Sequence, residues 1–287
     1  MRDYVIFTDS GSDISPEALR RWGVVSLPLS FKFSDSDKQY FDGELSSGAF
    51  YKQLREGKIS KTAAVNCEAF REKFIKTLDG GKDVLYLGFS SALSSTFNSA
   101  RLAAEKISKE GYTGEIVTVD TRSASAGLGL IVYLTARKKA EGLNLHDAAA
   151  YARGLIKSLC HWFTVDDLTH LKRGGRISPS AAFLGNILSI KPILYMDNGG
   201  HLKSHSKARG RRAALEALIS KYGELAEKKN STDIFISHAD CEKDAKLLSK
   251  MLSEKYGASV KEIFNIGSVI GSHAGAGTIA IFFLGKR

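Results

Sequence analysis

An apolar run that ends on a cluster of hydroxyl residues restricts the fold of this chain more than any other feature. Residues 84–89 are apolar enough for a buried strand, and residues 99–107 continue at helical spacing. Between these two segments lie Ser90, Ser91, Ser94, Ser95 and Thr96. A helix that starts at the carboxyl end of a parallel strand offers free N–H groups to an anion. We therefore expect an anion-binding turn here, with capping of the helix by its own serines as the alternative.

Three further segments repeat this arrangement of an extended run followed by a polar turn. Residues 3–8 lead to Asp9 and a polar turn, residues 59–62 run to Thr62 and then a helix, and residues 116–119 lead to a turn over 120–125. Four such units predict a parallel, doubly wound sheet with polar turns along one edge.

The pattern changes after residue 158. We expect a short helix over 166–173, two strands joined by a turn over 197–200, and a glycine-rich turn over 271–277 that carries His273. The predicted fold class is α/β with two domains. Residues 1–158 form a doubly wound domain and residues 159–287 an α+β domain, with the ligand in the crevice between them.

Composition indicates the cellular setting. The three cysteines lie far apart and are odd in number, which supports neither a disulfide framework nor a zinc site. Apolar stretches fall short of the ~18 residues of a membrane span, and the sequence starts directly with a strand. We expect a protein of the reducing cytoplasm.

The formal net charge of +10 raises the possibility of an acidic partner or a nucleic acid. Basic residues cluster at Lys203, Lys207, Arg209, Arg211 and Arg212. Aromatic residues do not interleave with them and no nucleic-acid-binding motif accompanies them, so we expect no nucleic acid. A docking patch for an acidic protein or a solvated helix start fits better.

One enzymatic alternative stays open. Residues 88–92, Gly-Phe-Ser-Ser-Ala, approximate the G-x-S-x-G nucleophile elbow of serine hydrolases, with Ser90 as nucleophile and His273 as base. The Walker A, HExxH and CxxC motifs are absent, and Gly275-Ala276-Gly277 precedes a strand rather than a helix. We expect neither a metal nor a cofactor.

Seven ordered motifs resemble the DegV family of bacterial fatty-acid-binding proteins over nearly the whole chain. They are TDSGSDIS, KTAAVN, SSALSSTFNSA, VDTRSASAGLGL, DDLTHLKRGGRIS, LGNILSIKPIL and IGSVIGSHAGAGTIAIFFLG. The resemblance implies a non-catalytic carrier that clasps a long-chain fatty acid and presents it to a separate ATP-binding fatty acid kinase subunit for acyl-phosphate formation. Transient contact with a membrane surface is compatible with such a role.

The same resemblance assigns the site residues. It places the fatty-acid carboxylate at Thr62 and Ser94, with His273 beside it, and Ser95 occupies the position of the family's glycine. A second departure is Ala63-Ala64-Val65, where the family has S-Q-P. Arg176 and Arg209 lie in segments too polar to line an acyl tunnel, so we expect them to dock the kinase.

Overall fold

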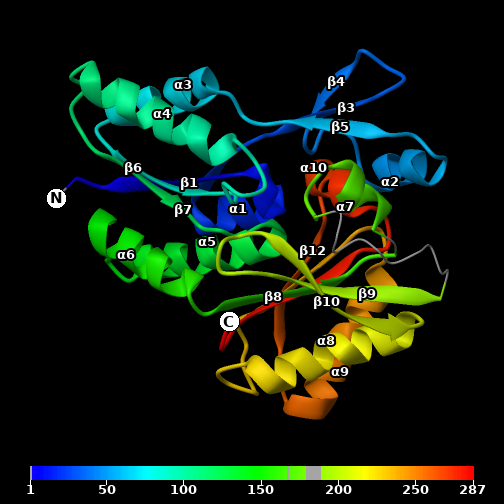
Figure 1. The fold of residues 1–287 in the computed structure, drawn as a ribbon. Coiled ribbons are helices and arrows are strands. Elements are labelled where there is room, and N and C mark those ends of the chain that lie inside the picture. The colour runs from blue at the N-terminus through cyan, green and yellow to red at the C-terminus, as the bar shows by residue number, and fades with distance from the viewer. Residues whose placement is uncertain (1, 167, 179–188) are drawn as a thin grey trace.

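The computed structural model describes residues 2–166, 168–178 and 189–287. The first part of the motif that begins at Leu184 lies outside these residues. Asp167, within the predicted 166–173 helix, also lies outside them. The described chain forms three sheets with helices packed around them (Figure 1). The predicted α/β class is confirmed, with a parallel sheet and a second sheet from the C-terminal part.

The first sheet is parallel throughout and has the order β2-β1-β6-β7. Its strands are β1 (Tyr4–Asp9), β2 (Val24–Leu27), β6 (Asp83–Gly88) and β7 (Ile116–Asp120). The helices of this part are α1 (Pro16–Trp22), α3 (Cys67–Asp79), α4 (Thr96–Lys109), α5 (Ser125–Ala140) and α6 (Leu145–Ile156). In Figure 1, α3 and α4 cover one face of the sheet, and α5 and α6 cover the other. All six residues of β6 are buried, as expected for a parallel strand covered on both faces.

The strand that carries Thr62 lies outside this parallel sheet, which corrects the prediction of four equivalent units. It forms a three-stranded antiparallel sheet, β4-β3-β5, with the strands β3 (Ser30–Phe33), β4 (Gln39–Phe41) and β5 (Ser60–Ala63). None of the four residues of β5 is buried. A strand this polar does not suit the centre of a parallel sheet, whose two faces are both covered.

The six-stranded sheet has the order β10-β9-β8-β13-β11-β12, in which only β11 and β12 pair in parallel. Its strands are β8 (Leu159–Thr164), β9 (Ile190–Met196), β10 (Leu202–Arg209), β11 (Ile234–His238), β12 (Val260–Asn265) and β13 (Ile279–Leu284). Residues 197–201 connect β9 to β10 as the predicted hairpin. Every strand of this sheet follows residue 158, where the sequence pattern changes.

The remaining helices are α2 (Ser47–Arg55), α7 (Thr169–Arg173), α8 (Arg211–Leu225), α9 (Glu242–Tyr256) and α10 (Ser268–Ala274). None of the helices in the described residues is long and apolar enough to cross a membrane. Phe31 of β3 and Tyr51 of α2 share one buried cluster with Ala239 and Ile266. The small sheet therefore packs directly on the C-terminal part of the chain.

His273 lies in a short helix, α10, rather than in the predicted glycine turn. Gly271 stands inside this helix because a Cβ there would lie 2.4 Å from Tyr51 Oη, so the glycine permits close packing against α2. Gly275, with φ of +82°, ends the helix. The glycines thus serve packing and termination, and His273 is held by a helix.

Candidate functional site

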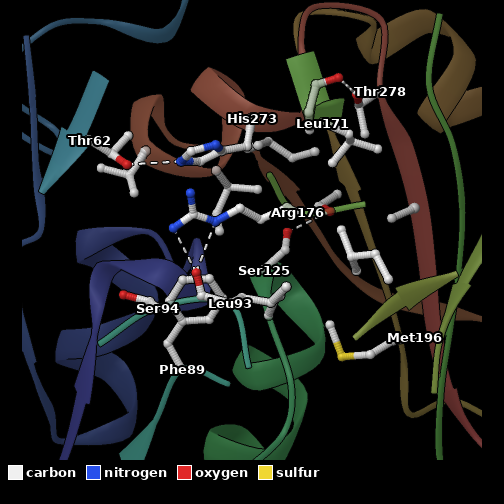
Figure 2. Close-up of a pocket in the computed structure, with 18 of the residues that line it drawn as sticks. Thr62, Phe89, Leu93, Ser94, Ser125, Leu171, Arg176, Met196, His273 and Thr278 are labelled. Atoms are coloured by element: carbon white, nitrogen blue, oxygen red, sulfur yellow. Dashed lines mark hydrogen bonds between the residues drawn. The ribbon is translucent and has the colours of Figure 1, made fainter. Parts of the chain in front are cut away.

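One cavity is lined by residues from the small sheet, the six-stranded sheet, the segment after β6, the start of α5, and α10 (Figure 2). Most of its wall is apolar and includes Leu29, Phe89, Leu93, Phe163, Met196 and Phe282. Thr62, Ser94, Ser95 and His273, the four residues predicted to hold a carboxylate, all line it. In Figure 2, Thr62, Ser94 and His273 lie on one side of the drawn residues, and Met196 lies on the opposite side.

The contact between Thr62 and His273 is the centre of the polar side. Thr62 Oγ1 and His273 Nε2 form a hydrogen bond of 2.8 Å. The other ring nitrogen, Nδ1, is buried and has no hydrogen-bond partner within the described part of the chain. Burial, together with the positive charge of Arg176 and with His170, lowers the pKa of His273 to about 4. The imidazole is therefore neutral at neutral pH. Its Nε2 is engaged by Thr62, and its Nδ1 packs against Gly174, where a Cβ would lie 2.1 Å away.

Ser94 lines the cavity and also orders the start of α4. Its Oγ accepts a hydrogen bond from the Thr96 backbone N–H at 3.2 Å and lies 2.9 Å from Thr96 Oγ1. Ser94 therefore lines the cavity and also bonds to the first residue of α4. Ser95 is exposed and makes no side-chain cap. Ala63, also exposed, lines the same side.

Arg176 also lines the cavity, which corrects the expectation that its segment is too polar to do so, and its role in kinase docking stays a prediction. Its Nε and Nη2 donate to the Leu93 carbonyl at 3.0 and 2.9 Å, and its Nη1 donates to the Gly174 carbonyl. The chain reverses at Gly175, whose φ is +68°, and this returns the arginine to the cavity. Sequence polarity was misleading because an arginine can pack its aliphatic stem while its guanidinium binds carbonyls. Burial lowers the pKa of Arg176.

Arg209 lies on β10, is exposed, and does not line the cavity. This placement agrees with the expected surface position. Its role in docking stays a prediction.

The geometry does not match a serine-hydrolase elbow. Ser90 is fully buried and its Oγ donates to the Gly200 carbonyl at 3.0 Å, while Ser91 Oγ donates to Asp120 Oδ2. His273, the proposed base, bonds to Thr62 instead. An elbow serine must be exposed and hydrogen-bonded to its base, and Ser90 meets neither condition.

A hydroxyl network on the cavity wall escaped the sequence analysis as a unit. Ser125 Oγ donates to Asp13 Oδ2 and lies 2.9 Å from Ser237 Oγ; Asp13 Oδ1 accepts from the Gly267 N–H at 2.8 Å. Burial raises the pKa of Asp13 well above its ordinary value. Asp13 and Ser125 belong to polar segments that follow strands, with Ser125 as the first residue of α5. Ser237 lies inside the apolar strand β11, so its sequence context does not indicate a site. Among the described residues, no cluster of histidine, cysteine or acidic side chains could hold a metal ion.

Comparison with known proteins gives a consistent family. The model described as "Uncharacterised protein, DegV family" matches residues 3–286. A DegV domain-containing protein of Clostridium perfringens is 42% identical over 286 residues, covering 99% of this chain and 98% of the relative. A DegV lipid binding protein from Thermotoga maritima has a TM-score of 0.88 at 29% identity, with 99% and 98% of the two chains covered. A fatty-acid-binding DegV family protein from Thermus thermophilus has a TM-score of 0.87 at 30% identity, with 98% and 99% covered.

Proposed function

Because this chain belongs to the DegV family, we propose that it binds a long-chain fatty acid in the cavity, with the carboxylate beside Thr62, Ser94 and His273. The observation that carries this proposal is an apolar cavity with one polar side, where Thr62, Ser94 and His273 all line the wall. The solved relatives described above bind lipid or fatty acid, which supports the same ligand class.

The energetics of the two ends differ. Moving ~15 methylenes out of water contributes roughly 12 kcal/mol at ~0.8 kcal/mol each, which offsets the costs of association and ordering. A desolvated carboxylate costs several kcal/mol unless it is hydrogen-bonded, and each charge-assisted bond returns about 1.5–3 kcal/mol. The tail therefore supplies affinity, while Thr62, Ser94 and the nearby charge of Arg176 orient the head group.

We further propose that the protein is a non-catalytic carrier that presents the carboxylate to a separate ATP-binding fatty acid kinase subunit. Exposed Ser95 and Ala63 border the polar side of the cavity, which supports access to the head group from solvent. Hydroxyl donors leave carboxylate lone pairs available to attack a phosphoryl group. The three free cysteines suit a reducing cytoplasm, where we place this activity.

Denaturing mass spectrometry of an organic extract of the purified protein tests the binding proposal. We expect one fatty acid per chain, and Thr62→Val should retain less of it than the wild type. If the wild type neither retains nor takes up any fatty acid, the proposal is wrong.

A second experiment tests presentation to the kinase. Hydroxylamine traps any acyl phosphate formed with the cognate kinase and ATP. The proposal expects this product only when both proteins are present.

A further inference from the structure

Three side chains from separate parts of the chain donate hydrogen bonds to the backbone of one hairpin turn. Ser90 Oγ donates to the Gly200 carbonyl at 3.0 Å, Arg122 Nη1 to the Asn198 carbonyl at 3.1 Å, and Arg287 Nη2 to the Asp197 carbonyl at 2.6 Å. Ser90 follows β6 and Arg122 follows β7. The β9–β10 turn is therefore anchored on the carboxyl edge of the parallel sheet (Figure 1).

The anchored turn fits closely against this edge. At Gly200, whose φ is +81°, a Cβ would lie 2.3 Å from Ser90 Oγ and 3.1 Å from Arg122 Cα. Asp197 Oδ1 also accepts hydrogen bonds from the backbone N–H groups of Gly199 and His201, both at 2.9 Å. The turn is thus ordered internally as well as held from outside.

The residues on either side of this turn belong to the cavity wall. Met196 and Leu202 pair across the hairpin and both line the cavity. Met196 is 3% exposed, so its side chain is enclosed. Figure 2 shows it across the cavity from Thr62 and Ser94, where the far end of a ligand anchored at those residues would lie.

We propose that the β9–β10 hairpin is the end wall of the acyl-binding cavity and sets the longest chain that fits, with Met196 and Leu202 as the specificity-determining residues. Ser90, Arg122 and Arg287 act as positioning residues that keep this wall in place. The inference rests on the proposed function. A closely packed hairpin cannot move far enough to admit an acyl chain that is two carbons longer, because buried side chains leave no spare volume.

Displacement titrations with straight-chain saturated acids of increasing length test this proposal. We expect wild-type affinity to rise with length and then fall sharply at one length. Met196→Ala should improve the affinity for the first rejected acid, relative to the last accepted one, by roughly tenfold, since about two methylenes gain a buried site. Leu202→Trp should move the limit to a shorter acid.

Arg122→Met separates the anchor from the wall itself, because Arg122 is exposed and does not line the cavity. Loss of its hydrogen bond to Asn198 should make the length limit less sharp, with head-group affinity for short acids unchanged. The matched control is Lys207→Met, exposed on β10, which should leave the length profile as in the wild type.

If Met196→Ala and Leu202→Trp bind acids with the wild-type length profile, the end-wall proposal fails while fatty-acid binding stands. If the wild type binds no acid of any length, the proposed function fails with it.

Discussion

Thr62 Oγ1 and His273 Nε2 lie 2.8 Å apart although 211 residues separate them in the sequence. Thr62 belongs to β5 and His273 to α10. Ser60 Oγ, on the same strand, donates to Ser272 Oγ of α10 at 2.7 Å, so two adjacent hydroxyl contacts hold the strand and the helix in register. The polar side of the cavity is therefore built at a contact between the small sheet and the C-terminal part of the chain.

Thr62→Val should weaken fatty-acid binding by roughly 1–3 kcal/mol, because it removes one donor to a desolvated anion while keeping the side-chain shape. Isothermal calorimetry with a long-chain acid measures the effect. Thr77→Val is the control, since Thr77 is half-buried on α3, does not line the cavity, and donates its hydroxyl to the Lys73 carbonyl. Equal affinities for Thr62→Val and the wild type would remove Thr62 from the carboxylate site.

Ser94→Ala should lower two quantities at once. The free energy of unfolding should fall by about 1 kcal/mol because the start of α4 loses the bond between Ser94 Oγ and the Thr96 N–H. Fatty-acid affinity should fall by roughly 1–3 kcal/mol. Ser46→Ala removes the N-cap of α2, where Ser46 Oγ accepts from the Ala49 N–H, and should change stability alone. An affinity loss shared by both variants would make the Ser94 effect one of stability.

His273→Gln should change the pH dependence of both stability and binding. In the unliganded protein the pKa of His273 is about 4, below the ordinary 6.5, so the unfolded state binds more protons between these values. The stability contributed by His273 is complete above pH ~6.5 and is lost as pH falls toward 4. A bound carboxylate raises this pKa, so affinity should weaken as pH rises through the liganded value.

Denaturant unfolding and calorimetry across this pH range should show both dependences reduced in His273→Gln. The exposed His146 on α6 provides the control variant His146→Gln, which should keep the wild-type binding profile. Identical binding profiles in His273→Gln and the wild type would show that the imidazole does not respond to the ligand.

The two arginines should separate lipid binding from docking. Arg176→Met should lower the amount of retained fatty acid, because Arg176 lines the cavity and holds the Leu93 carbonyl. Arg209→Glu should leave retained lipid unchanged and lower acyl-phosphate formation with the cognate kinase, since an acidic side chain would repel an acidic partner surface. If Arg209→Glu instead loses lipid and forms acyl phosphate at the wild-type rate, the docking role of Arg209 is wrong.

Local periodicity and turn chemistry predict many of the elements, because both depend on residues that are close in the sequence. The site residues come instead from the resemblance to the family. The apolar run of β6, the hydroxyl-rich start of α4 and the hairpin at residues 197–201 all appear where the pattern predicts them. Thr62, Ser94, Ser95 and His273 were assigned from motifs separated by long stretches of chain, and all four line one cavity. The division into domains at residue 158 stays a prediction.

The neighbours of each element become known only from the folded chain. β5 pairs with β3 rather than joining the parallel sheet, and Ser90 is buried under the Gly200 carbonyl rather than exposed as a nucleophile. Arg176 reaches the cavity because Gly175 reverses the chain toward Leu93. Burial and hydrogen-bond partners depend on residues that are distant in the sequence, and a periodic pattern holds no information about which distant residues those are.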